Sequence, residues 1–173
     1  MEYLNSYNLL ISNLTLLAHV GLVGFILLYV FQRKLVNNFI KKFYIQLTGL
    51  FSLAAFAGSM FYSNVIGFQP CSLCYWQRIF MYPILLLSII ALIKKDKLNS
   101  DYFLGLSGVG LLISAYHIYI QFIPNPLPCN VSGQGVSCTD NWVLEYGYIT
   151  IPVMAATCFA WVFVVNLINK TNK

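Results

Sequence analysis

Hydrophobic residues gather in five long runs along the chain, and each run is bounded by charged or turn-forming residues. A helix that spans a bilayer needs about 20 mostly apolar residues, and each run reaches or nearly reaches that length. The pattern therefore predicts five transmembrane helices, over roughly residues 9–31, 43–66, 74–93, 102–123 and 148–167. The first run has no basic stretch before it and no clean small-residue cleavage site after it, so we expect a retained helix rather than a signal peptide.

The composition also indicates an integral membrane protein. Of the 173 residues, 59% are hydrophobic and only 9% are charged, and the mean hydropathy is +0.73. An ordinary soluble domain is not built from so few charges. The net charge of +5 does not indicate a nucleic-acid partner, because no basic face or tail stands apart from the apolar runs.

The basic residues predict how the chain is oriented in the membrane. Nine of the ten Lys and Arg residues lie in the first connector, the third connector and the C-terminal tail. With five spans these three regions face one side, and the positive-inside rule assigns that side to the cytoplasm. The N-terminus and the second and fourth connectors are then expected outside the cytoplasm.

The five cysteines divide between these compartments. Cys71, Cys74, Cys129 and Cys138 belong to the part of the chain expected to face outward, where disulfides persist. Cys158 lies within the last predicted span and is interpreted as a small apolar packing residue.

The clearest chemistry lies in the stretch Pro70-Cys71-Ser72-Leu73-Cys74-Tyr75-Trp76-Gln77-Arg78. In a helix Cys74 and Arg78 share one face, because they are four residues apart. The helix start and the guanidinium both favour a thiolate at Cys74. A thiolate of low pKa beside a second sulfur is what disulfide exchange requires.

Arg78 is expected about one helical turn inside the membrane boundary. The apolar stretch 79–93 covers only roughly 22 Å of the roughly 30 Å hydrocarbon core, so the third span must begin near Cys74. A charge at that depth either snorkels to the surface or serves a function. The functional interpretation is a cation aimed at the head of a lipid-soluble quinone, whose carbonyls gain negative charge on reduction.

The residues leave three interpretations of the four outward cysteines: a redox relay, static disulfides, or a zinc site with four sulfur ligands. A disulfide between Cys71 and Cys74 closes too short a loop to contribute much stability. Cys129 and Cys138 are separated by eight residues of a loop with Pro and Gly, which argues against zinc. The pattern favours the redox interpretation, and no metal is expected.

Two further features are less specific. Small residues, among them Gly105, Gly108 and Gly110, recur in the fourth span and predict close helix packing. His117 near the outer end of that span is either a packed, hydrogen-bonded residue or a functional one. His19 in the first span has no neighbours in the sequence that indicate a function.

The stretch from Pro70 to Arg78, followed by Met81-Tyr82-Pro83, resembles the signature of the DsbB/BdbC disulfide bond formation proteins, and of the BdbC branch in particular. The resemblance covers roughly residues 43–167 and includes the second cysteine pair. It implies an all-α integral membrane protein, with a DsbB-type four-helix bundle and one additional N-terminal transmembrane helix. The chain then divides into residues 1–42, the additional helix and basic connector, and residues 43–173, the DsbB-like redox domain.

The same resemblance implies a quinone-dependent protein-disulfide oxidoreductase in the cytoplasmic membrane of a bacterium, with its redox loops outside and its C-terminus in the cytoplasm. Such a protein re-oxidises an extracytoplasmic thioredoxin-fold partner of the DsbA kind and passes the electrons to ubiquinone or menaquinone. Carried over by position, Cys129 would form the mixed disulfide with the partner and Cys138 would be its loop mate. Cys71 would accept the electrons, Cys74 and Arg78 would meet the quinone, and His117 matches a family histidine near it.

Two other functions remain open from the sequence. One is a reductase that runs electrons the other way, like a vitamin K epoxide reductase or a reductant conduit. Such a conduit should place redox cysteines within its spans or on both faces of the membrane, and only Cys158 is so placed, without a second cysteine to pair with. The other is a membrane scaffold with static disulfides, which leaves Arg78 unexplained.

Overall fold

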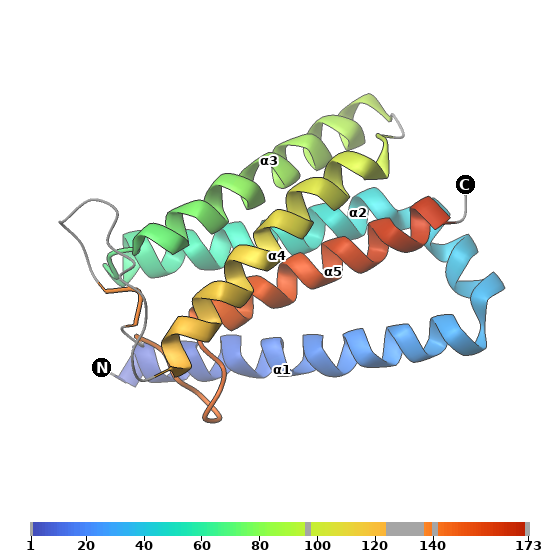
Figure 1. Ribbon diagram of the computed structural model, residues 1–173. Helices are drawn as coiled ribbons and strands as arrows, with labels where there is room; N and C mark the ends of the chain where they lie inside the picture. The colour runs from blue at the N-terminus through green and yellow to red at the C-terminus, as the bar shows by residue number, and fades with distance from the viewer. Residues whose placement is uncertain (1, 96–97, 124–136, 140–141, 172–173) are drawn as a thin grey trace.

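The computed structural model describes residues 2–95, 98–123, 137–139 and 142–171. This part of the chain folds into five long helices: α1 (Glu2–Phe31), α2 (Arg33–Met60), α3 (Ser72–Lys94), α4 (Ser100–Phe122) and α5 (Ile151–Thr171) (Figure 1). All five are long and apolar enough to cross a membrane. The five predicted spans and the all-α class are confirmed.

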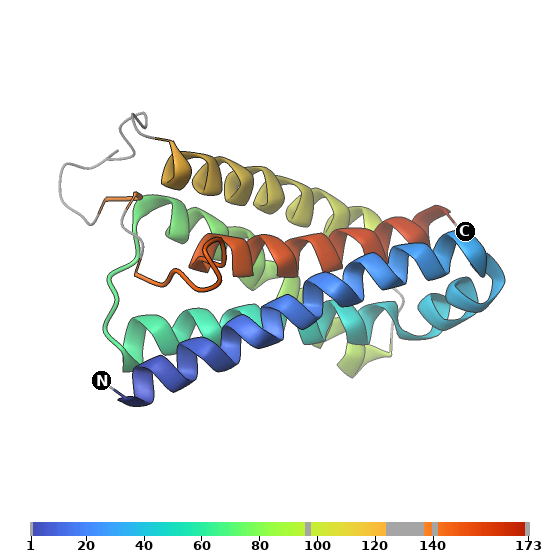
Figure 2. The same ribbon diagram turned by 90° about the horizontal axis from the view of Figure 1, so that it is seen from below.

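Helices α2 to α5 form a four-helix bundle, in which each helix packs against the next and α5 closes the ring against α2. Helix α1 lies along the outside of this bundle, against α2 and α5 (Figures 1 and 2). Only 6% of the residues in the most apolar stretch of α1 are buried, so α1 packs on the bundle from outside and is not part of its core.

The two ends of the bundle differ in chemistry. One end, called here the cysteine end, carries the N-terminal end of α1, the start of α3 and the end of α4 (Figure 1), and Cys71, Cys74 and Cys138 form one cluster there. The opposite end, called the basic end, carries the start of α2, the end of α3 and the C-terminal end of α5, with Arg33, Lys94 and Lys170. The cysteines and the basic residues therefore lie at opposite ends of the bundle, as their alternation between successive connectors of the sequence predicts.

Several helix boundaries differ from the predicted ones; α1, for example, begins at Glu2 rather than at 9, and α5 ends at Thr171 rather than at 167. Helix α2 begins at Arg33, so the basic connector is itself helical; Lys and Arg are good helix formers, and hydropathy marks only the apolar part of a helix. Helix α5 begins at Ile151 rather than at 148. The residues before it form a tight turn, in which Tyr146 and Gly147 have φ of 53° and 74° and Glu145 pairs with Ile149.

Helix α2 ends at the cysteine end in a wider turn, the π-helix η1 (Phe61–Val65). Its last bond runs from the Ile66 amide to the Phe61 carbonyl, over 3.2 Å. Turns of this kind occur often at functional sites, because the extra residue changes where neighbouring side chains point. Here Ser63 on η1 reaches the side chain of Arg78 on α3.

The centre of the bundle is closely packed where α4 crosses α5. Phe159 is fully buried, in a cluster with Met81, Ile84, Phe103 and Val162. An ideal Cβ placed on Gly110 would lie 2.2 Å from Cε1 of Phe159, so only a glycine fits between the two helices. A Cβ on Gly105 would meet no atom within 4 Å, so the glycines of this span do not share one role.

Candidate functional site at the cysteine end

The start of α3 brings Cys71 and Cys74 together. Cys71 is the N-cap residue, with an extended backbone, and its carbonyl accepts the first helical bond from Tyr75 over 3.2 Å. Both thiols are free, and their sulfurs lie 3.2 Å apart. The unpaired amides of a helix start carry partial positive charge, which stabilises a thiolate at this place.

The surroundings favour the thiolate at Cys71. The hydrogen bond with Cys74, and after it the one with His117, lowers the Cys71 pKa to about 4, although burial opposes the charge. The sequence places the favoured thiolate at Cys74 because Arg78 shares its helix face. That reasoning missed His117, which comes from another helix and contacts Cys71.

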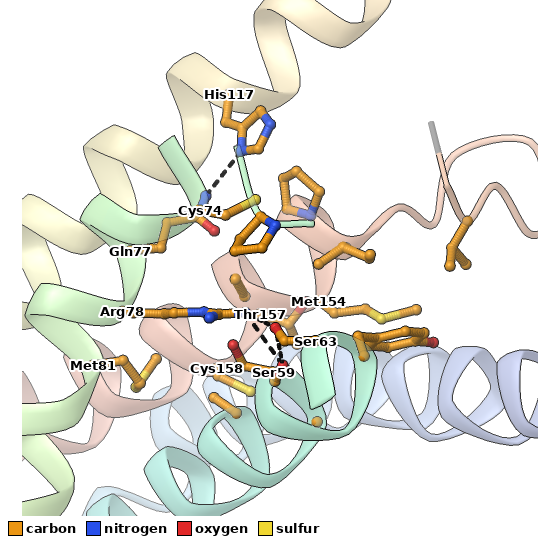
Figure 3. Close-up of a pocket in the computed structure, with 18 of the residues that line it drawn as sticks. Ser59, Ser63, Cys74, Gln77, Arg78, Met81, His117, Met154, Thr157 and Cys158 are labelled. Atoms are coloured by element: carbon orange, nitrogen blue, oxygen red, sulfur yellow. Dashed lines mark hydrogen bonds between the residues drawn. The ribbon is translucent and has the colours of Figure 1, made fainter. Parts of the chain in front are cut away.

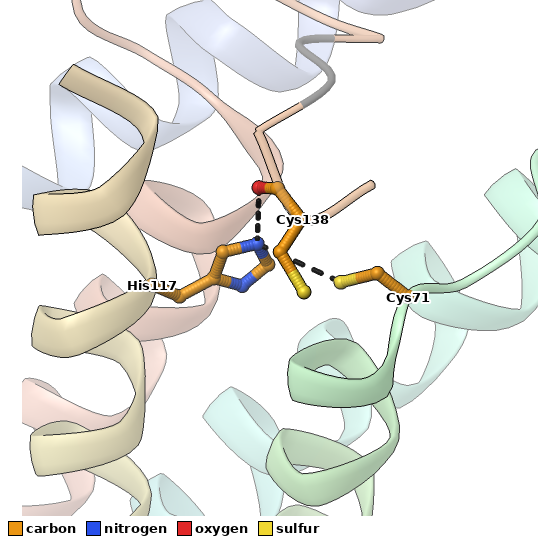
Figure 4. Close-up of side chains that lie close together, drawn as sticks. All are labelled: Cys71, His117 and Cys138. Atoms are coloured by element: carbon orange, nitrogen blue, oxygen red, sulfur yellow. Dashed lines mark hydrogen bonds between the residues drawn. The ribbon is translucent and has the colours of Figure 1, made fainter. Parts of the chain in front are cut away.

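His117 stands on α4 beside both cysteine segments and is 2% exposed. Its Nδ1 lies 3.3 Å from Nε2 of Gln77, which donates to it, so the ring proton is on Nε2. That Nε2 lies 3.7 Å from Sγ of Cys71 and 3.3 Å from the carbonyl oxygen of Cys138. The Nε2 proton is therefore aimed at the junction of the two cysteine segments (Figure 4).

Cys138 is buried at this junction and takes part in a disulfide. Its sulfur, that of Cys71 and a ring nitrogen of His117 all lie within 4.8 Å of one another. Figure 4 shows the two sulfurs side by side, with the imidazole next to them. Cys129, the expected mate of Cys138, lies outside the described residues.

Cys71, His117 and Cys138 are residue types that could also hold a metal ion. Metals bind the thiolate form of cysteine, however, and Cys138 is engaged in a disulfide. The arrangement in the structure is therefore one of thiols poised beside a disulfide, which suits thiol–disulfide exchange.

Arg78 lies one helical turn beyond Cys74 and reaches across to α2 and η1. Its Nη2 donates to the carbonyl oxygen of Ser59, 3.3 Å away, and to Oγ of Ser63. Its guanidinium carbon lies 5.7 Å from the centre of the Tyr75 ring. Neutral dipoles and an aromatic face thus hold the charge in place.

A partly open cavity of about 370 Å³ lies beside these groups, lined by residues of all five helices and of η1. Its wall is mostly apolar, and Cys71, Cys74 and Cys138 all border it. Figure 3 shows how Arg78 from α3, Ser63 from η1, and Met154, Thr157 and Cys158 from α5 are arranged around it.

Two donors on the cavity wall have no partner among the described residues, Nε of Arg78 and the hydroxyl of Tyr82. A buried donor without a partner is costly, so these groups suit a ligand with two hydrogen-bond acceptors. Cys74, Arg78 and Tyr82 recur every four residues, so the sequence already places them on one helix face. No spacing in the sequence connects α3 with Ser59, Ser63 and Thr157, because each of these residues reaches the site from another helix.

Comparison with known proteins supports the same chemistry. Residues 41–169 match the family model "Disulfide bond formation protein DsbB". The SPbeta prophage-derived disulfide bond formation protein B of Bacillus subtilis is 38% identical over 132 residues, which are 76% of this chain and 87% of that protein. A probable disulfide formation protein of Oceanobacillus iheyensis is 38% identical over 136 residues, or 78% of this chain and 90% of that protein.

A probable disulfide formation protein C 2 of Bacillus anthracis is 32% identical over 134 residues, which are 78% of this chain and 95% of that protein. No solved structure matches the chain. Residues 1–40, which include all of α1, lie before the matched region. The match covers the four-helix bundle, both described cysteine segments, Arg78 and His117, so the chain belongs to the DsbB family and is a multi-pass bacterial membrane protein and disulfide oxidoreductase with a BdbC-like sequence.

Proposed function

We propose that this protein re-oxidises a dithiol protein outside the cytoplasm and passes the two electrons to a membrane quinone. One observation carries the proposal: the sulfurs of Cys71 and Cys74 lie 3.2 Å apart beside the sulfur of Cys138, at the border of an apolar cavity. Thiol exchange and a site for a lipid-soluble acceptor then adjoin each other.

The first half of the reaction is exchange between two cysteine pairs. The partner's thiolate attacks the loop disulfide that contains Cys138, with Cys129 as its expected mate. Reduced Cys138 then attacks the sulfur of Cys71 in an oxidised Cys71–Cys74 pair, a new sulfur–sulfur bond forms, and Cys74 leaves as the thiolate. Attack of the second loop thiol on Cys138 releases Cys71, whose negative charge the Nε2 proton of His117 stabilises.

The residues of the cavity fit a quinone. Its apolar wall suits a lipid-soluble ring, and the unpartnered donors of Arg78 and Tyr82 suit two ring carbonyls. A bound quinone supplies an acceptor for two electrons and two protons. Arg78 stabilises negative charge in the cavity, and Cys74 borders both the cavity and Cys71. His117 also borders the cavity, but its nitrogen atoms contact Cys71, Gln77 and Cys138.

The orientation follows from the charges. The basic end carries the described basic residues of the connectors and tail, and the positive-inside rule places it in the cytoplasm. The cysteine end then faces outward, where a thioredoxin-fold partner can reach the loop that contains Cys138.

The test is an anaerobic mixture of the purified protein with a reduced thioredoxin-fold dithiol and a soluble quinone. We expect the wild type to form quinol and Cys74→Ser to form none. Leu86→Ala, on the lipid-facing side of the same helix and 58% exposed, is the control that should retain the activity. Quinol formation that persists in Cys74→Ser, or a wild type that forms none while its disulfides stay intact, contradicts the proposal.

A further inference from the structure

Helix α1 borders the cavity although it lies before the region that matches the family. Four residues on one face of α1 take part in the wall: Ile11, Leu14, Thr15 and Ala18. The helix is held there by polar contacts, among them the indole N–H of Trp161, which donates to the carbonyl of Ala18 over 3.1 Å. Side chains of α1 next to this face are therefore close to whatever the cavity binds.

His19 follows Ala18 and connects α1 to α5. Its Nε2 lies 2.7 Å from Oγ1 of Thr157. The Thr157 hydroxyl donates to the Val153 carbonyl over 2.8 Å, so its oxygen accepts the bond from His19, and Nε2 carries the ring proton. The other nitrogen, Nδ1, lies 3.5 Å from the hydroxyl of Tyr148, which donates to it.

The two ends of this chain of hydrogen bonds lie in different places. Thr157 forms part of the cavity wall, where Figure 3 shows it among the labelled residues. Tyr148 lies in the turn before α5 at the cysteine end and is 41% exposed. Hydrogen bonds therefore run without a break from the hydroxyl of an exposed tyrosine, through the imidazole, to a hydroxyl on the cavity wall.

We propose that His19 relays protons from the outer surface to the cavity, from Tyr148 through its ring to Thr157. The inference rests on the proposed function, because it is a quinone that consumes protons in this cavity. His19 is a positioning residue in this scheme, since it acts through Thr157. Rotation of the Thr157 hydroxyl away from the Val153 carbonyl turns its proton into the cavity, while His19 replaces it from Nε2 and regains a proton at Nδ1.

The proton count calls for such a route. Reduction of a quinone to a quinol takes two electrons and two protons, and the electrons come from the two sulfurs as the Cys71–Cys74 bond forms. Cys71 reacts as a thiolate, because its pKa is lowered, and so brings no proton. Cys74 leaves the exchange as a thiolate, takes up a proton to become the free thiol of the reduced pair and supplies that proton, and the relay supplies the second from outside, which balances both charge and atoms.

A purely structural function of His19 predicts a different outcome. In that case the imidazole only ties α1 to Thr157, and a glutamine whose amide N–H can donate to the same oxygen should replace it. Glutamine cannot accept a proton on one atom and release another proton from a second atom at neutral pH. His19→Gln therefore separates the tie from the relay, and His19→Ala removes both.

The first experiment needs no turnover. The chain has two histidines, so isotope-labelled histidine gives two sets of ring nitrogen signals by NMR, and His19→Gln assigns them. We expect His19 to be protonated on Nε2 and bare on Nδ1, and Tyr148→Phe to shift the Nδ1 signal. A proton resident on Nδ1, or an Nδ1 signal that ignores Tyr148→Phe, overturns the relay.

The second experiment follows single-turnover quinol formation by the pre-reduced full-length protein at saturating quinone. We expect His19→Gln and His19→Ala to slow this step about tenfold or more, with an unchanged KM for the quinone and unchanged exchange with the partner dithiol. Tyr148→Phe should slow it as well. Tyr146→Phe is the matched control, because Tyr146 also donates to α1, at Asn13, but lies outside the relay.

The outcomes separate the two proposals. A wild type that forms quinol, with His19→Gln equally fast, refutes the relay and leaves the proposed function standing. A wild type that forms no quinol refutes the proposed function, and the relay with it. Added imidazole should restore the rate of His19→Ala if the ring carries protons, and a failure to restore it counts against the relay.

Discussion

Gly110 offers the sharpest test of the packing, because two physical effects predict opposite results for Gly110→Ala. Alanine is the better helix former by about 1 kcal/mol, so α4 alone would gain stability. In the structure, however, the new Cβ would lie 2.2, 2.4 and 2.7 Å from three ring atoms of Phe159. Ordinary contacts begin at 3.4 Å, so the ring or the helix must move by about 1.2 Å.

Phe159 borders the cavity but is fully buried among the side chains at the centre of the bundle, so its ring can move only by giving up these contacts. Overpacking a core costs about 1–3 kcal/mol, and an overlap as large as this one belongs to the upper part of that range, so the cost exceeds the gain of about 1 kcal/mol in helix propensity. We therefore expect the free energy of unfolding of Gly110→Ala to fall by about 1–2 kcal/mol. The assay is SDS-induced unfolding in mixed micelles, followed by helical circular dichroism.

Gly105→Ala is the matched control, since it has the same chemistry on the same helix but a Cβ there meets nothing within 4 Å. It should be neutral or slightly stabilising. Gly110→Ala combined with Phe159→Leu should recover part of the loss, because the smaller side chain leaves space for the methyl group. A Gly110→Ala protein as stable as the wild type would show that the contact between α4 and α5 is not as close as described.

Three further predictions concern the site and the basic end. His117→Ala removes a hydrogen bond that lowers the Cys71 pKa, so this pKa should rise toward its ordinary value. The measurement is the rate of Cys71 alkylation in the reduced protein as a function of pH, because only the thiolate reacts. In the wild type this rate should stay high as pH falls until about 4, and in His117→Ala it should decline at a higher pH. Identical pH profiles of the two proteins would contradict this. Arg78→Gln should slow single-turnover quinol formation about a hundredfold with part of the rate restored in Arg78→Lys, and an unaffected rate would exclude a function for the charge. Lys170→Ala removes an exposed ion pair of 2.6 Å between α5 and α4, and should change the free energy of unfolding by less than about 1 kcal/mol in the same SDS assay; a larger loss would contradict this.

The spans, their number and the cysteine motif could be predicted from the sequence, because each is a property of neighbouring residues. A membrane helix needs an unbroken apolar stretch, and Cys71, Cys74 and Arg78 are held together by one helix start. Boundaries were less accurate where polar residues continue a helix, as at Arg33, or where an apolar segment turns before its helix begins, as at Tyr148.

The partners of the site residues could not be predicted in the same way. The contact of His117 with Cys71 joins residues 46 positions apart, and that of Arg78 with Ser63 joins residues 15 apart. Such contacts depend on how the helices pack against each other, which hydropathy does not determine. His19 is the clearest case, because nothing near it in the sequence indicates the bond to Thr157, 138 positions away.

The way Arg78 is held has a thermodynamic consequence. It is the basic side chain among the described residues of the cavity wall, and its hydrogen bonds go to neutral groups, so no acidic side chain pairs with its charge. A cavity of this kind binds an anion more tightly than the neutral form of the same molecule. Under the proposed function, the guanidinium therefore favours electron transfer from the sulfurs into the cavity over the reverse transfer. The direction of electron flow then depends in part on the position of this one buried positive charge.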